Sequence, residues 1–467
     1  MSASNAYNSL SLCTTIGTPS CSGSIARPLI LPSLCGQTGA RSSEIRLERL
    51  VSFSWQMVGP VLAGVNPMGD KSAGLDNSDV DNHGKPALIV DRKGHIHVIF
   101  GAHGGSAMLG HNAFGTPGGG KMTHAVSKKP GDISAWEILD NISPFGTYTQ
   151  FVKMDDGTLY LFYRHGSHRS DWVYQKSSDD GRTFTPEVSV LKHKVQAGNA
   201  HVHDSWYAWF AKGRGNTITA ISSYHPCGDS PAHSNGRYNA YYMTLNCTDG
   251  IWTNAAGARL EVSVTKQYAD QKTLIVNSGI TRTDRGACRV DVEGNPHLFF
   301  KYGGELRYYQ WTGQTWTASG AITKGDGELI VDSPKATRLL LGSRSGTTAE
   351  VGWWKTADGG LTWAKGAVLL SRASPAGDGF EIGALLENYG AGGLVIAAER
   401  VSPTNLYRKM ILLGANGPVT RPEEEASQIK VLLASAEKAG VNSTDAWDAK
   451  RKKKEAQGKI SVVSPTP

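Results

Sequence analysis

One pattern recurs along this chain and limits its fold more than any other feature. A short β-rich run, a turn containing glycine, an alternating strand and a third strand ending near an aromatic residue appear in residues 86–105 and the segment after them. The unit returns at residues 149–168, and looser copies follow. Its turn glycines, beginning with Gly94 and Gly157, recur about every 60 residues if one weak turn is allowed, the size of a propeller blade with its loops.

Six such units are visible, and residues 45–80 are the candidate for a seventh. Glycine is abundant, with 55 residues, and helical periodicity is nearly absent before residue 420, which favours an all-β fold with many hairpins. The sequence therefore predicts a seven-bladed β-propeller of four-stranded antiparallel blades over residues 45–418. Residues 1–44 are expected to be poorly ordered, and residues 419–467 to form a charged, helix-prone tail.

Two segments, residues 177–184 and 356–363, fit the Asp-box pattern S/T-x-D-x-G-x-T-F/W. In such a turn the Asp side chain accepts hydrogen bonds from local amides, Gly accepts the required dihedral angles, and the aromatic residue packs between sheets. Two copies support a propeller. They indicate little about chemistry, because the motif belongs to an outer hairpin far from the central channel.

Composition limits the classes of partner but does not identify one. The formal charge is +7, which favours small acidic partners such as uronates or phosphates. The one basic run, residues 450–454, is interpreted as a solvated helix or tail rather than a nucleic-acid contact. No stretch is apolar enough to span a membrane. Six scattered cysteines define no disulfide framework, and the sequons at Asn141, Asn246 and Asn442 permit glycosylation without proving secretion.

Polar residues at the ends of two consecutive hairpins are the candidates for chemistry. His83 and His103 flank the first hairpin as Tyr148 and Arg164 flank the next. A β-hairpin brings its two open ends together at one rim of the sheet, so the four residues can face a common pocket. Taken singly, each is better interpreted as a structural His or a surface residue. Their parallel placement in consecutive blades makes a shared site an equally good interpretation of the set. Arg285 is a further candidate for binding an acidic substrate.

Histidines elsewhere allow two interpretations. His95 and His97 alternate on one strand and are interpreted as sheet-surface residues. Metal-like spacing occurs in the His-Val-His and His-Pro-Cys segments, and nitrogen and sulfur ligands of this kind suit zinc. The alternative is that these are unrelated loop residues. The candidate ligands of a structural zinc ion are His203, His225, Cys227 and His233.

Residues 81–104 and 147–184 together resemble the BNR-type seven-bladed polysaccharide lyases. These include the ulvan lyases and, by the order and spacing of the four candidate residues, most closely the fungal L-rhamnose-α-1,4-D-glucuronate lyases. The resemblance implies acid/base roles for His103 and Tyr148, and places Arg164 and His83 at the uronate carboxylate. It also supports His225 and Cys227 as zinc ligands and implies an extracellular protein, although the first residues lack an ordinary secretory signal.

The implied reaction is a β-elimination on an acidic glycan, either an arabinogalactan-type gum or an ulvan-like polymer. It removes the C5 proton of glucuronate and expels rhamnose from C4, leaving a 4,5-unsaturated product. Arg164 suits the carboxylate because a guanidinium binds it with two parallel hydrogen bonds. The proposed base is His103, with Tyr148 sharing the proton or donating it to O4. The chemistry requires no cofactor, and a monomer without nucleic-acid or membrane partners is expected.

Two other classes stay open at this point. A sialidase-like glycoside hydrolase is suggested by the Asp boxes and would need arginines on a carboxylate, for which Arg27, Arg285, Arg338 and Arg400 are candidates. A propeller that only binds glycans is the second alternative, because a fold alone never establishes activity. Elimination generates a conjugated double bond that absorbs ultraviolet light, whereas hydrolysis does not.

Overall fold

The structure is a computed structural model, and it describes residues 86–418 apart from ten short gaps. The gaps are residues 109–110, 116–118, 133–134, 167–168, 197–198, 227–235, 375–378, 387–393, 403–404 and 415–416. The predicted seventh blade, from residues 45–80, and both predicted flanks lie outside the described residues. The domain boundaries at residues 45 and 418 therefore stay predictions.

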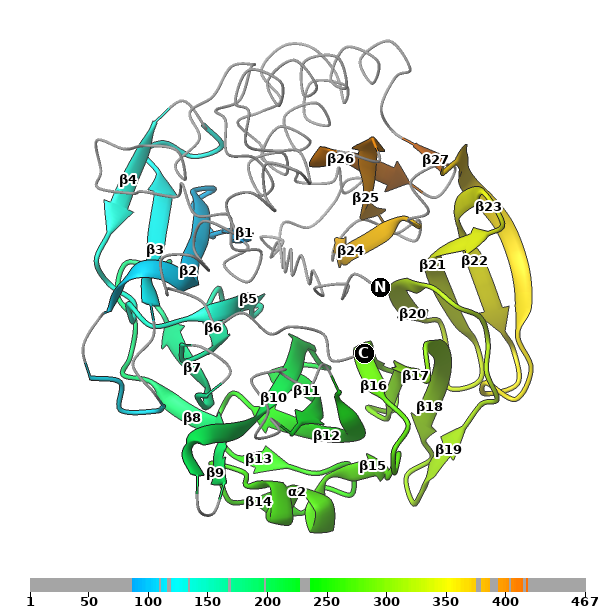
Figure 1. Cartoon of the computed structure of the whole chain (residues 1–467), viewed down its shortest axis with the longest axis horizontal. Coiled ribbons are helices and arrows are strands. Elements are labelled where there is room, and N and C mark those ends of the chain that lie inside the picture. Colours follow the sequence, from blue (N-terminus) through cyan, green and yellow to red (C-terminus); the bar gives the residue numbers. More distant parts are fainter. Residues whose placement is uncertain are drawn as a thin grey trace, which may run out of the picture.

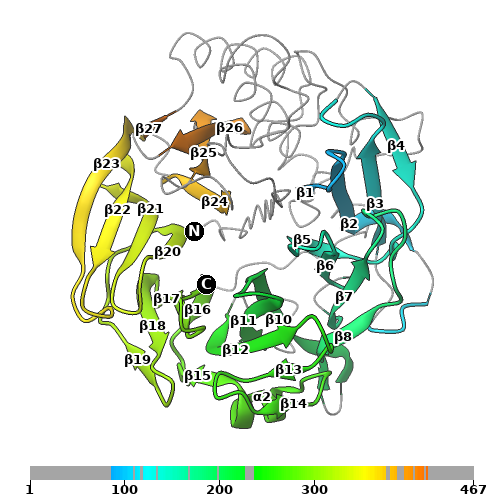
Figure 2. The ribbon, with the colours of Figure 1, turned by 180° about the vertical axis from the view of Figure 1, so that it is seen from behind.

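The described chain forms six antiparallel sheets, blades 1 to 6, arranged around a ring (Figure 1; from behind, Figure 2). In blades 1, 2, 4, 5 and 6 the first strand lies toward the centre of the ring and the last strand lies outside (Figure 1). An all-β propeller with four-stranded antiparallel blades is thus confirmed. The strands of blades 1 and 2 are β1 (Ala87–Val90), β2 (Ile96–Met108), β3 (Gly119–Ser127), β4 (Trp136–Leu139), β5 (Thr147–Lys153), β6 (Leu159–Arg164), β7 (Trp172–Ser177) and β8 (Val188–Leu191).

Blades 4 to 6 repeat the four-stranded order. Their strands are β16 (Thr283–Val290), β17 (Pro296–Tyr302), β18 (Glu305–Trp311), β19 (Trp316–Ala318), β20 (Asp326–Val331), β21 (Thr337–Ser345), β22 (Thr348–Thr356), β23 (Ala364–Ala373), β24 (Glu381–Leu386), β25 (Leu394–Ser402), β26 (Asn405–Gly414) and β27 (Gly417–Pro418).

Blade 3 is enlarged to seven strands. They are β9 (Lys194–Gln196), β10 (Asn199–Lys212), β11 (Thr217–His225), β12 (Tyr238–Asn246), β13 (Trp252–Thr253), β14 (Arg259–Leu260) and β15 (Leu274–Val276). The short helix α2 (Lys266–Lys272) precedes β15, and its N-terminus is capped by the Thr265 side chain, which accepts a hydrogen bond from the amide of Tyr268.

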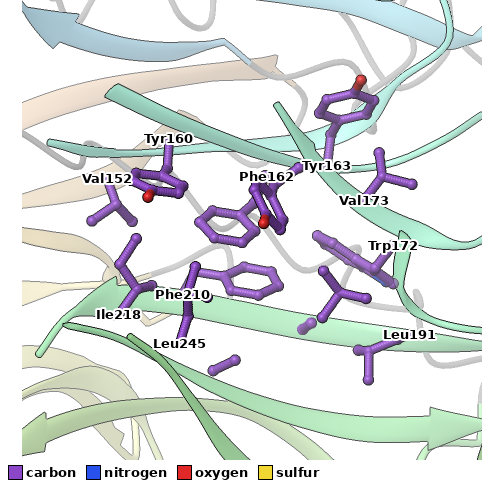
Figure 3. Close-up of a cluster of buried hydrophobic side chains, with 14 of the residues drawn as sticks. Val152, Tyr160, Phe162, Tyr163, Trp172, Val173, Leu191, Phe210, Ile218 and Leu245 are labelled. Carbon is purple, nitrogen blue, oxygen red and sulfur yellow. The ribbon is translucent and has the colours of Figure 1, made fainter. Parts of the chain in front are cut away.

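Aromatic side chains fill the interface between blades 2 and 3. Phe162 of β6 stacks on Phe210 of β10 with ring centres 3.9 Å apart, and both rings are buried. Figure 3 shows these rings with Val152, Trp172 and Leu245 between the two sheets. Because each blade is covered on both faces, its strands carry near-continuous apolar runs, and this packing holds neighbouring inner strands at fixed positions.

Both Asp boxes form the expected turns between the third and fourth strands of their blades. Asp179 accepts hydrogen bonds from the amide and the hydroxyl of Thr183, and Asp358 does the same for Thr362. The first box packs on the neighbouring blade: a Cβ atom at Gly181 would lie 2.7 Å from the His97 ring. The turn therefore helps hold one blade against the next.

The expectation that His97 is a sheet-surface residue was wrong. His97 is fully buried, and its Nε2 lies 3.3 Å from the Asp91 carboxylate while its Nδ1 lies 2.9 Å from Nε2 of buried His124. Strand alternation predicts which residues share a face, but here the neighbouring Asp-box turn covers that face.

No helix among the described residues is long and apolar enough to cross a membrane.

Candidate active site

Arg164 is the last residue of β6 and is fully buried. Its partner across the antiparallel ladder is Thr147 of β5, so the β5–β6 hairpin brings Arg164 beside Tyr148. The Nε and Nη1 atoms of Arg164 are buried and have no hydrogen-bond partner among the described residues. Leaving a buried charged donor unpaired is costly, and an anion supplied by a ligand would satisfy it.

Tyr148 adopts a backbone conformation that is rare outside glycine. Its φ is +57°, and the β5–β6 pairing shifts register between Thr147 and Gln150, as in a β-bulge. The bulge directs the Tyr148 ring over the Arg164 guanidinium, whose carbon lies 4.7 Å from the ring centre. Trp172 stacks on the same ring at 6.4 Å. Such local strain is often retained at functional sites.

A second tyrosine completes the cluster from blade 3. Tyr207 of β10 is buried, and its ring meets Tyr148 edge-on with centres 5.5 Å apart. Arg237, directly before β12, lies over the Tyr207 ring at 3.7 Å and pairs with Asp284 of β16. The Tyr207 oxygen accepts hydrogen bonds from Arg237 and from the Tyr148 hydroxyl. Blades 2, 3 and 4 therefore all contribute to one cluster.

The pKa values of the two phenols shift in opposite directions. Burial raises the pKa of Tyr207, but the charges of Arg164 and Arg237 outweigh it and bring that pKa down to about 8. Burial and the neighbouring Tyr207 raise the pKa of Tyr148 well above its ordinary value, against the opposing charge of Arg164. Groups whose pKa values are pushed apart in this way suit an acid and a base in one reaction.

The other sequence-predicted residues lie at different distances from this cluster. His103 belongs to β2 of the adjacent blade 1, but its side chain is outside the described part of the structure, and so is the whole of His83. Arg285 of β16 is buried and pairs with Asp326 at 2.8 Å and Glu328 at 3.7 Å. These two carboxylates compensate its charge, so Arg285 is poorly suited to a substrate carboxylate.

Only one predicted zinc ligand has a described side chain. His225 is buried at the end of β11, and its Nδ1 lies 2.7 Å from the carbonyl oxygen of Gly236, to which it donates. This bond fixes the ring orientation, as in many metal-bound histidines. Cys227, His233 and the His203 side chain lie outside the described residues. Within those residues, no group of three or more His, Cys, Asp or Glu side chains is placed to hold a metal ion.

Sequence reasoning missed Tyr207 and Arg237. Tyr207 could have been found, because it lies on the inner strand of the blade after Tyr148, where polar residues converge on the channel. Arg237 had no comparable signal. It precedes an ordinary strand, and only the packing of blade 3 against blade 4 brings its guanidinium between Tyr207 and Asp284.

The chain is similar to a known family of repeat proteins and to several ulvan lyases. The profile described as BNR repeat-containing family member matches residues 65–321. An ulvan lyase from Nonlabens ulvanivorans is 42% identical over 387 residues, covering 79% of this chain and 80% of the relative. An ulvan lyase from Alteromonas sp. (strain LOR) is 40% identical over 384 residues, covering 78% and 77%. A solved structure of a PL25 ulvan lyase shares 37% identity, covers 81% of this chain and 88% of its own, and superposes with a TM-score of 0.69.

The fold and the buried Arg–Tyr cluster thus define a BNR-repeat propeller whose relatives are polysaccharide lyases. The chain belongs to the ulvan lyase family PL25. Because the members of this family are carbon–oxygen lyases, a lyase is a better interpretation of this chain than a sialidase-like hydrolase. Arg338, one of the arginines considered for that alternative, is paired with Asp332 through two hydrogen bonds of 2.7 Å.

Proposed function

We propose that this protein is an ulvan lyase that cleaves the bond between glucuronate and rhamnose by β-elimination. The observation that carries the proposal is the buried Arg164 guanidinium, whose Nε and Nη1 have no partner among the described residues and which lies against two phenols. Relatives with about 40% identity are named ulvan lyases, and a related PL25 structure, 36% identical, contains -[GlcA(1-4)Rha3S]-.

Arg164 would bind the uronate carboxylate. Removal of the C5 proton moves negative charge into that carboxylate, so a fixed cation stabilises the transition state more than the ground state. The site is prepared in advance, because Arg164 is already desolvated and held by packing against the rings of Tyr148 and Tyr207. His83 is proposed to add a hydrogen bond to the same carboxylate.

The hydrogen-bonded pair Tyr148 and Tyr207 would move the proton. Phenolate character is favoured at Tyr207, while Tyr148 holds its proton and donates to Tyr207. One proton leaves C5, its electron pair forms the C4=C5 double bond, the C4–O4 bond breaks, and one proton is returned to O4. In glucuronate the C5 hydrogen and O4 lie on one face of the ring, so an adjacent pair can do both. His103, the base expected from the sequence, belongs to the neighbouring blade and is the second candidate for this role.

A finer assignment is also proposed. The order and spacing of His83, His103, Tyr148 and Arg164 resemble the fungal rhamnose-glucuronate lyases, which favours a terminal rhamnose on an arabinogalactan-type gum as a second substrate. Both substrates are acidic glycans and would use the same carboxylate site. We also propose an extracellular location, a monomer, and a structural zinc ion held with His225 and Cys227.

The test incubates the purified full chain with ulvan and, separately, with arabinogalactan-type gum. We expect ultraviolet absorbance of the unsaturated uronate to rise together with new reducing ends on ulvan, and together with released rhamnose if the gum is a substrate. New reducing ends without that absorbance would establish hydrolysis instead. Glycan binding with neither signal would leave only a binding module. The exposed Arg214→Ala variant is the matched control for Arg164→Ala.

A further inference from the structure

The chain carries three sequons that the proposed lyase activity does not use. They begin at Asn141, Asn246 and Asn442, and the last lies outside the described residues. N-glycosylation needs an accessible Asn carboxamide and a folded chain that tolerates a sugar on its nitrogen. The structure separates the two described sequons clearly on both counts.

The Asn141 carboxamide is enclosed in a hydrogen-bonded chain. Its Nδ2 donates to the carbonyl oxygens of Gly181 at 2.8 Å and Arg182 at 2.9 Å, in the first Asp-box turn. Its Oδ1 accepts from Nδ1 of the buried His124 at 2.8 Å. Replacing an amide hydrogen by a sugar would break one of these bonds and force the sugar into the contact between blades 1 and 2. Asn141 is therefore unsuited to carry a glycan in the folded protein.

The Asn246 carboxamide lies at an open turn. Asn246 ends β12, is half-buried, and is followed by exposed residues from Thr248 to Gly250. Its Oδ1 accepts from the amide of Thr248 at 3.0 Å, while its Nδ2 donates to the side chain of Asp249 at 3.2 Å. A sugar on Nδ2 would replace only this bond to an exposed partner. The backbone bond from Gly250 to Asn246, 2.9 Å long, would stay in place.

A glycan at Asn246 would also lie away from the proposed active site. Strand β12 begins at Tyr238, next to Arg237 of the Arg–Tyr cluster, and ends at Asn246. A strand rises about 3.3 Å per residue, so these ends are roughly 26 Å apart. The β10–β11 turn, which includes Asn216, lies beside Thr248, since Nδ2 of Asn216 donates to the Thr248 hydroxyl at 2.9 Å. The sequon thus belongs to the face opposite the one that carries Arg237.

We propose that Asn246 is an acceptor for an N-linked glycan, placed on the face of the propeller opposite the substrate site. The co-reactant is a lipid diphosphate-linked oligosaccharide. A bond forms between Nδ2 of Asn246 and the anomeric carbon of the donor sugar, the bond from that carbon to the diphosphate breaks, and Nδ2 loses one proton. The lipid diphosphate is the leaving group. The Asn246 site does not depend on the proposed lyase activity, whose site serves here only to name the two faces of the propeller.

The test expresses the full chain behind a secretory leader in a eukaryotic host. The chain carries Asn442→Gln, so that the third sequon adds no glycan signal. Glycopeptide mass spectrometry should find glycan on Asn246 and unmodified Asn141. A glycosidase-sensitive shift of the intact mass should disappear in Asn246→Gln and equally in Thr248→Ala, which keeps the Asn246 carboxamide. An unmodified Asn246 in the secreted protein, or a glycan on Asn141, would overturn the proposal.

A second measurement tests the placement. Lyase turnover of the glycosylated protein should stay within about twofold of the enzymatically deglycosylated protein, because the glycan does not reach the cluster. A loss of tenfold or more that deglycosylation reverses would contradict the assignment to the opposite face. Glycan occupancy is read by mass alone, so a protein without lyase activity would still answer the first question, and failure of the two proposals can be told apart.

Discussion

The guanidinium of Arg164 lies 4.7 Å from the centre of the Tyr148 ring, and the two residues come from the open ends of one hairpin. A second ring, that of Tyr207, lies 5.2 Å from the same guanidinium. The cation is held by aromatic faces, while two of its nitrogen atoms lack a hydrogen-bond partner among the described residues. Such a site has its charge ready for an incoming carboxylate.

Replacing Arg164 should therefore damage binding and turnover together. Arg164→Ala is expected to lower kcat/KM by at least about two orders of magnitude, because the guanidinium contacts the carboxylate before and during proton removal. Arg164→Lys keeps a charge but loses the two-pronged geometry, so it should recover only part of the loss. Steady-state kinetics on ulvan provide the measurement. Arg164→Ala with near-normal kcat and KM would remove this residue from the mechanism.

The pH dependence of kcat/KM should distinguish the two candidate bases. With Tyr207 as the phenolate, activity rises with pH, falls about tenfold per unit below a midpoint of about 8, and levels off above it. In Tyr207→Phe this limb should disappear together with most of the activity. A midpoint near the ordinary His pKa of about 6.5 would favour His103 instead.

Tyr148→Phe tests the other phenol and is expected to lower kcat by at least about two orders of magnitude.

The sequence was enough to predict that Tyr148 and Arg164 lie together, because the two open ends of one β-hairpin meet and antiparallel register is local. It was not enough for Arg237, whose position over Tyr207 depends on how blade 3 packs against blade 4. The same limit explains His97. Alternation fixed its face of the strand, but only the neighbouring blade determines that this face is buried. Repeats therefore predict blades well and contacts between blades poorly.

Zinc content can be measured without an activity assay. If His225 and Cys227 hold a structural ion, elemental analysis of the purified protein should find about one zinc per chain, and Cys227→Ser should lower both that content and the melting temperature. Cys288→Ser is the matched control, since the Cys288 thiol is buried and free elsewhere in blade 4. Purified protein without zinc would exclude the metal site.

His165, directly after Arg164, should contribute strongly to stability. Its buried ring places Nδ1 2.7 Å from Asn112 and Nε2 3.1 Å from Ser143 and 3.3 Å from the carboxylate of Glu187. The hydrogen bond from His165 lowers the pKa of Glu187 to about 2, so this carboxylate stays charged.

His165→Ala would remove the hydrogen bonds of the ring to these three partners and leave a cavity in its place, and should lower the free energy of unfolding by about 2 to 4 kcal/mol. Denaturant titration measures it, with exposed His111→Ala as the control. A double-mutant cycle with Glu187→Ala should show coupling of at least about 1 kcal/mol, and additive losses would contradict a direct pair.

Acid should destabilise the protein through His124. Burial, and then the charge of His97, lower the pKa of His124 from 6.5 to about 3. Between these two pH values His124 is therefore neutral in the folded chain and protonated in the unfolded chain. This contribution to stability is complete above pH 6.5 and is lost as the pH falls toward 3, by about 1.4 kcal/mol per unit. Between pH 7 and pH 4.5 the native protein should therefore lose about 2 to 3 kcal/mol more than His124→Gln, measured by denaturant unfolding at both pH values. Equal losses in the two proteins would mean that His124 titrates normally. The buried pair His97 and His124 would then not contribute to the acid sensitivity.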